Sequence, residues 1–90
     1  MSRRERWSIL GAILLALEEE LQRGEEARLS NVATRANLPY DRLVAYLTKL
    51  QAGGLLTEDK PPRITEKGRE FLRHYRQWVS VLDRFGVDQL

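Results

Sequence analysis

The chain has no cysteine and only one histidine, His74, among its 90 residues. Without thiols it can form neither a disulfide framework nor a thiolate metal site, and it has no cysteine nucleophile. No serine is placed to form a catalytic triad with the histidine. The carboxylate runs 18–20 and 25–26 have no histidine or cysteine beside them to complete a metal site. We therefore expect no enzyme, no metal and no cofactor, and the absence of cysteine suits a cytoplasmic location.

Long apolar runs are also missing. The longest, from Ile9 to Leu17, is shorter than the roughly 20 residues that cross a bilayer. Three arginines precede this run, as in an export signal, but Glu18 follows it directly and no small-residue cleavage site is present. We therefore expect neither a membrane partner nor export.

The net charge is small, because 15 basic residues against 13 acidic residues leave +2. With 42% hydrophobic and 31% charged residues, the composition is typical of a globular protein. A chain of this length suits one domain, whose core buries only about 60–65% of the unfolded chain's surface. A second subunit is therefore an expected source of stability.

The charges are unevenly distributed along the chain. Residues 27–52 hold four basic residues and one acidic residue, whereas residues 11–26 hold five acidic residues and one basic residue. This polarity would let one face approach DNA while the acidic end points away. The alternative is that Glu18, Glu19 and Glu20 only form a well-solvated helix surface.

Apolar residues at intervals of three and four predict a first helix over about residues 3–23. Its apolar stripe consists of Trp7, Leu10, Leu14, Leu17 and Leu21. Ser2 and Glu5 have the spacing of a capping box at its start, and Gly24 offers a left-handed stop.

Two further helices follow. Ser30 offers an N-cap for a short helix that ends at Ala36, and Leu38-Pro39 forces an extended turn. Pro39 suits the start of a third helix, which ends before Gly53-Gly54. Two helices joined by so short a turn predict a helix-turn-helix.

The periodicity changes after Gly54. Residues 55–57 and 63–65 resemble two strands joined by a polar connection, which predicts a hairpin, and residues 27–29 resemble a further short strand. Thr65 can cap a last helix that reaches Phe85. The predicted fold class is therefore mainly α with a small β-hairpin wing (α+β). In this interpretation a winged helix-turn-helix core occupies residues 1–65, and a long C-terminal helix occupies residues 66–90 of the same domain.

Several short motifs carry a family resemblance. Residues 36–43 read Ala-Asn-Leu-Pro-Tyr-Asp-Arg-Leu, and Gly54-Leu55-Leu56 is followed by Thr65-Glu66-Lys67-Gly68 and Phe71-Leu72. From the first helix to about Leu82, this 10.5 kDa chain resembles the small archaeal winged-helix DNA-binding proteins. The resemblance implies an abundant, chromatin-associated or transcription-regulatory protein, bound to the nucleoid in the cytoplasm. It also implies a homodimer joined by an antiparallel coiled coil of C-terminal helices.

In winged-helix docking the second helix of the helix-turn-helix enters the major groove. A helical wheel of residues 39–52, with the leucines inward, turns these residues outward: Asp41, Val44, Ala45, Thr48, Lys49 and Ala52, with Arg42 at the margin. The residues that we expect to contact DNA, mostly through its phosphates, are Arg28, Arg35, Arg42, Thr48, Lys49, Lys60 and Arg63. Asp41 and the wing residues Glu58 and Asp59 oppose DNA, and ordinary surface charge is the alternative interpretation.

The last helix has more apolar surface than its own domain needs. Its apolar residues continue as a heptad-like seam beyond the part that can pack on the core. The residues that we expect at a two-fold dimer interface are Tyr75, Trp78, Val79, Leu82 and Phe85. Packing of these residues against the first helix is the alternative. Gly86 ends the seam after about two heptads, so we do not expect a long coiled-coil rod.

The sequence thus predicts a homodimeric protein that binds double-stranded DNA, chiefly by phosphate contacts. The alternative is a winged-helix protein–protein interaction module that never contacts DNA, which the weakly basic third helix and the acidic wing favour. A ligand-responsive regulator would need a pocket that the sequence does not reveal, and no small-molecule substrate is evident.

Overall fold

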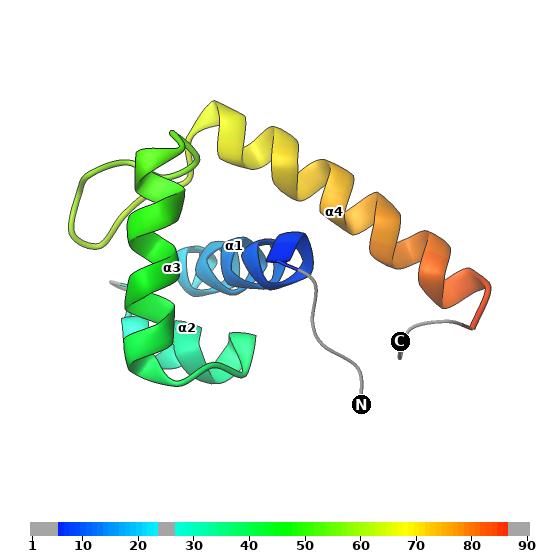
Figure 1. Ribbon diagram of the computed structural model, residues 1–90, viewed down its shortest axis with the longest axis horizontal. Coiled ribbons are helices and arrows are strands. Elements are labelled where there is room, and N and C mark those ends of the chain that lie inside the picture. The colour runs from blue at the N-terminus through cyan, green and yellow to red at the C-terminus, as the bar shows by residue number, and fades with distance from the viewer. Residues whose placement is uncertain (1–5, 24–26, 87–90) are drawn as a thin grey trace.

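The computed structural model describes residues 6–23 and 27–86. Within them the chain forms four helices: α1 (Arg6–Gln22), α2 (Leu29–Ala36), α3 (Tyr40–Ala52) and α4 (Glu66–Arg84). In Figure 1, α1 lies across the middle, α3 stands upright on the left, α2 lies below and α4 runs above toward the right. These four helices confirm the helices expected from periodicity. The predicted capping box at Ser2 and the stop at Gly24 lie outside the described residues.

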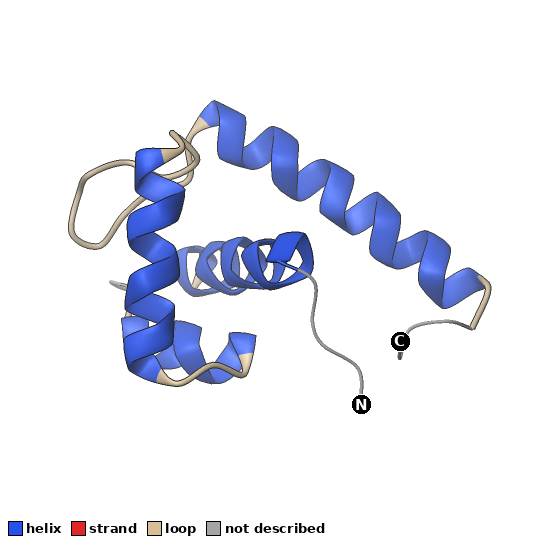
Figure 2. Cartoon of the chain, viewed as in Figure 1, coloured by secondary structure: helices blue, strands red, loops and turns tan. Residues whose placement is uncertain are grey.

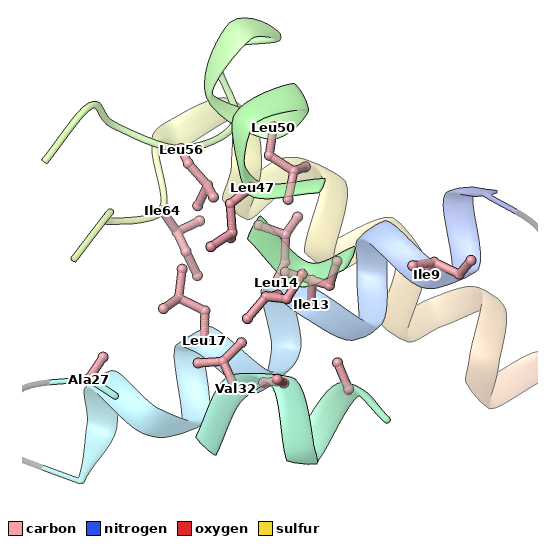
Figure 3. Close-up of a cluster of buried hydrophobic side chains, with 14 of the residues drawn as sticks. Ile9, Ile13, Leu14, Leu17, Ala27, Val32, Leu47, Leu50, Leu56 and Ile64 are labelled. Atoms are coloured by element: carbon pink, nitrogen blue, oxygen red, sulfur yellow. The ribbon is translucent and has the colours of Figure 1, made fainter. Parts of the chain in front are cut away.

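Helix α1 is the centre of the core and contacts each of the other three helices. Ile13, Leu14 and Leu17 are completely buried, since they lie on the helix face that repeats every three to four residues. Figure 3 shows these side chains meeting residues from the rest of the chain. The residues packed around them are Val32, Ala33, Ala36, Leu43, Leu47, Leu50, Leu56, Ile64 and Leu72.

The turn between α2 and α3 has the predicted form. Asn37 adopts the left-handed conformation with a φ of 58°, which asparagine tolerates better than most residues. The backbone N–H of Leu38 then donates to the carbonyl of Ala33 at 2.9 Å. Pro39 is extended, with a φ of −60° and a ψ of 147°, and precedes the first residue of α3. The helix-turn-helix is therefore confirmed.

The predicted β-hairpin wing is wrong. Figure 2 shows helices and loops in the described part of the chain, and no strand. Leu56 and Ile64 form a single isolated antiparallel bridge, beside which the N–H of Thr57 donates to the carbonyl of Arg63 at 2.8 Å. The pairing stops there because Pro61 and Pro62 have no N–H to donate. Residues 57–63 are therefore a loop, the 57–63 loop, and the described chain is mainly α rather than α+β.

The expected short strand before α2 is also absent. Arg28 has an extended backbone, with a φ of −97° and a ψ of 121°, but residues 27–28 pair with no described strand and Leu29 already belongs to α2. An extended backbone alone is not a strand, because a strand needs a hydrogen-bonded neighbour.

The end of α3 is tied directly to the start of α4. The hydroxyl of Thr65 donates to the carbonyl of Gly54 at 2.6 Å and accepts from the N–H of Gly68 at 3.1 Å. Lys67 Nζ donates to the carbonyl of Gly53 at 2.8 Å. Gly68 itself lies so close to the carbonyl of Leu55 that a Cβ would clash with this backbone atom. The glycines and Thr65-Glu66-Lys67-Gly68 therefore fix the angle between the two helices, and the predicted cap at Thr65 is confirmed.

Candidate nucleic-acid interface

The outer face of α3 is the first part of the candidate interface. Leu43, Leu47 and Leu50 are buried against the core, which turns the opposite face of the helix to solvent. The exposed residues of that face are Tyr40, Asp41, Arg42, Val44, Ala45, Thr48, Lys49 and Ala52. The exposure expected from the helical wheel is confirmed, while contact between this face and DNA stays a prediction.

The polar side chains of this face are held in different ways. Thr48 donates its hydroxyl to the carbonyl of Val44 at 3.2 Å, which leaves its oxygen free to accept. Lys49 Nζ lies 5.6 Å from the centroid of the Tyr46 ring, within the range of a cation–π contact. Arg42 is exposed and pairs with no carboxylate of the described residues. Asp41 lies in the first turn of α3, where a negative charge stabilises the helix dipole.

A groove lies between α3 and the 57–63 loop. It has a volume of about 470 Å³ and is bounded by Val44 and Thr48 of α3, Leu29 of α2, and Lys60 and Pro61 of the loop. Lys60 and Arg63 are both exposed, as are their acidic neighbours Glu58 and Asp59. The groove therefore brings Lys60 of the loop beside α3, together with the opposing carboxylate of Asp59.

Arg35 lies apart from these cations, because it faces α1. Its Nε donates to Glu20 Oε1 at 3.0 Å, and its Nη1 lies 3.5 Å from Glu19 Oε1. Arg28, at the start of α2, is exposed and makes no ion pair with a described residue. Of the seven residues expected at DNA, Thr48 and Lys60 line this groove. Arg42 and Lys49 are exposed on α3, Arg63 is exposed in the 57–63 loop, Arg28 precedes α2, and Arg35 pairs with carboxylates of α1.

Glu20 is the residue that the sequence interpretation missed. It was expected on a solvated surface, yet its side chain is only 4% exposed and accepts from Asn31 Nδ2 at 3.3 Å as well as from Arg35. Burial raises the pKa of Glu20, but hydrogen bonds from Arg35, Asn31 and the backbone of Arg28, with the charge of Arg35, lower that pKa below its ordinary value. A signal was present, since Glu20 follows Leu17 by three residues and so continues the buried face of α1.

Comparison with known families decides the class of the domain. A family model described as winged helix-turn-helix matches residues 3–82. The chain belongs to the winged helix-turn-helix family. No curated protein and no solved structure matches it. Winged helix-turn-helix domains are typically non-enzymatic and bind DNA or regulate transcription. In this winged helix-turn-helix, the 57–63 loop follows α3 in the place of the wing.

The described part of this winged helix-turn-helix holds no group of three or more metal-ligating side chains. No helix in the same residues is long and apolar enough to cross a membrane.

The residues expected at a dimer interface fall into two groups along helix α4 of the winged helix-turn-helix. Tyr75 is half-buried on its own α1, where Gly11 leaves room for the ring. Trp7 meets both Tyr75 and Trp78 edge-to-face, with ring centroids 6.1 and 5.9 Å apart. These two residues therefore pack toward the first helix, which is the alternative interpretation. Val79 and Leu82 stay partly exposed, and Phe85 is 75% exposed.

An apolar groove of about 350 Å³ opens on the same side of α4. It is lined by Trp7, Phe71, His74, Tyr75 and Trp78. Trp78 remains 45% exposed, and Arg76 of α4 forms an ion pair with Glu18 of α1. Helix α4 is thus fixed to α1 by aromatic contacts and one ion pair, while its C-terminal apolar residues remain open.

Proposed function

We propose that this protein binds double-stranded DNA through the outer face of α3 and the flanking 57–63 loop, as a chromatin-associated or transcription-regulatory factor of the nucleoid. The observation that carries the proposal is the free outer face of α3, which presents Arg42, Thr48 and Lys49 while its leucines fill the core. A helix exposed in this way in a helix-turn-helix is the element that enters the major groove.

The proposed contacts are mostly to phosphates. Arg42 and Lys49 on α3, Lys60 and Arg63 in the 57–63 loop, and Arg28 before α2 are exposed cations. Such side chains neutralise phosphates and provide affinity more than sequence choice. On α3, Arg42 and Lys49, together with Thr48, also have the donors to read a base edge.

The experiment that tests the proposal is a titration of duplex DNA at several salt concentrations. If all five cations contact phosphates, the slope of log K against log salt is about −4 to −5 per protomer, since each contact contributes about −0.9. Shuffled duplexes of equal length reveal any sequence preference. No binding at low salt would rule the proposal out.

We also propose that the protein is a homodimer joined through α4. Phe85, at the C-terminal end of α4, is 75% exposed, and Trp78, which lines the apolar groove, is 45% exposed. An apolar surface of this kind usually marks an interface, and a two-fold axis lets one helix serve both subunits. A dimer would double the number of phosphate contacts on one duplex.

The second candidate function is a protein–protein interaction module. It is favoured by Tyr40 and Val44, which are 53% and 41% exposed on the same face of α3 as Asp41. An apolar and partly acidic helix face suits a protein partner better than a phosphate backbone. The salt titration separates the two candidates, since this alternative predicts no DNA binding at any salt concentration.

A further inference from the structure

The buried carboxylate of Glu20 joins α1 to the segment that leads into the helix-turn-helix. It accepts hydrogen bonds from Asn31 Nδ2 at 3.3 Å and from Arg35 Nε at 3.0 Å, both on α2. The backbone of Arg28, just before α2, also hydrogen-bonds to it. Arg23 Nη1, in the turn that follows α1, lies 3.5 Å from the same carboxylate. A buried charge is tolerated only when it is paired and hydrogen-bonded, so these contacts fix where α2 lies on α1.

Arg35 is the only described side chain that joins the two carboxylates of Glu19 and Glu20. The Arg35 side chain is about one-third exposed, but its charge is already balanced by two acidic neighbours. Turning toward a phosphate would leave Glu20 buried without its strongest donor. Removing one partner from a buried ion pair destabilises a protein by more than the intact pair stabilises it. Arg42 has no such partner among the described residues and is free to turn.

We infer that Arg35 is a positioning residue, anchored by Glu20, that sets the angle of the helix-turn-helix and does not itself contact DNA. The turn from Asn37 to Pro39 is short and hydrogen-bonded, so a shift of α2 on α1 moves α3 with it. The DNA part of this inference rests on the proposed function, whereas the anchoring of α2 to α1 does not.

The test compares the salt dependence of DNA binding for the wild type, Arg35→Gln and Arg35→Lys. Arg42→Gln is the matched control, because it removes a residue that is proposed to contact a phosphate. A lost phosphate contact reduces the slope of log K against log salt by about 0.9. A lost positioning residue lowers affinity by the same factor at every salt concentration and leaves the slope unchanged. We expect parallel lines for both Arg35 variants, weakened by up to roughly tenfold, and a shallower line for Arg42→Gln.

Arg35→Lys is the decisive variant, because lysine keeps the charge but loses the planar fork that joins two carboxylates. A slope that Arg35→Gln reduces and Arg35→Lys restores would overturn the inference, since only a phosphate contact behaves in that way. A wild-type protein that binds no DNA would instead overturn the proposed function.

The anchoring itself is tested by urea unfolding of Glu20→Gln, Arg35→Gln and the double variant. This measurement also covers the case in which Arg35→Gln folds too poorly for titration, because the double variant has no unpaired buried charge. We expect the double variant to be more stable than the sum of the single changes indicates. Additive changes would show that the two residues are not coupled and would overturn the inference.

Discussion

The ring of Tyr75 on α4 lies directly against Gly11 on α1, so that a Cβ on the glycine would overlap Cδ1 of the ring. The missing side chain therefore allows the two helices to approach, and it places Tyr75 beside Trp7. Glycine inside a helix is otherwise unfavourable, so its presence here has a packing reason.

Gly11→Ala is expected to destabilise the protein. Overpacking costs about 1–3 kcal/mol, and over most of that range the cost exceeds the roughly 1 kcal/mol that alanine gains over glycine within a helix. Urea unfolding followed by tryptophan fluorescence measures the change and also reports on Trp7 and Trp78. Gly53→Ala is the control, because Gly53 has a helical φ of −81° and its added Cβ would lie 3.2 Å from the flexible end of Leu55. Equal stability of the two variants would contradict this account of Gly11.

Thr65→Ala is expected to lower the free energy of unfolding by about 1–2 kcal/mol. The hydroxyl caps α4 through Gly68 and also donates to Gly54 at the end of α3, and both bonds are lost. The control is Thr34→Ala, since Thr34 donates only to Ser30 on an exposed surface of α2 and its loss costs within about 0.5 kcal/mol. A Thr65 variant as stable as the Thr34 variant would mean that this turn does not fix α4.

The sequence predicted those features that depend on neighbours in the chain. Leucines at intervals of three and four predicted the buried face of α3, and Thr65 predicted the N-cap of α4. Both predictions succeeded because these effects act within a few residues of the chain. The hairpin prediction was wrong because a strand depends on its hydrogen-bonded partner segment as well as on its own residue pattern. Leu56 and Ile64 do meet across the loop, but β-patterned residues form a strand only when both backbones can continue the ladder, and Pro61-Pro62 prevents this.

The candidate site was predictable in part. The outward face of α3 followed from helix geometry alone, so the exposure of Arg42, Thr48 and Lys49 was predicted correctly, while their contact with DNA stays a prediction. Arg35 carries the same charge as Arg42, and no local pattern distinguishes them. Its partner, Glu20, precedes it by 15 residues, and only the packing of α2 on α1 brings the two together. Which cations of a basic segment are available to DNA is therefore decided by tertiary structure.

Acid is expected to weaken the link between α1 and α2. The pKa of Glu20 in the folded protein lies below its ordinary value of 4.5. The charged carboxylate therefore contributes its full stability above about pH 4.5 and loses that contribution as the pH falls through the lowered folded value. Glu20→Gln removes this titration, so the stability gap between wild type and variant should shrink as the pH falls from 7 to 3.

Urea unfolding at a series of pH values measures that gap. Glu19→Gln is the matched control, because Glu19 carries the same charge on the same helix but is 48% exposed. Its gap to wild type should be smaller at neutral pH than the gap for Glu20→Gln. A Glu20→Gln gap of the same size at pH 7 and pH 3 would contradict the role given to the charged carboxylate.

Arg42→Ala combined with Lys49→Ala is expected to weaken DNA binding and to reduce the slope of log K against log salt by about 1.8, which is 0.9 for each lost phosphate contact. The control removes the same charge from α4 with Arg73→Ala and Arg84→Ala, both exposed. Filter binding or fluorescence anisotropy at several salt concentrations gives both slopes. If the two double variants have the same slope, binding follows net charge and α3 is not the contact.

Leu82→Glu combined with Phe85→Glu is expected to convert a dimer into a monomer. Both side chains lie near the C-terminal end of α4, beyond the part that Trp7 and Gly11 hold on α1, so their replacement leaves the core of each subunit in place. A carboxylate in an apolar interface must be desolvated without a partner, which costs several kcal/mol. Light scattering or sedimentation measures the mass.

Gln77→Glu with Ser80→Glu is the control, because these exposed residues lie on the same helix and receive the same added charge. If the Leu82 and Phe85 variant still has the mass of a dimer, α4 does not join the subunits. If the wild type is a monomer, the exposed apolar surface of α4 serves something other than self-association.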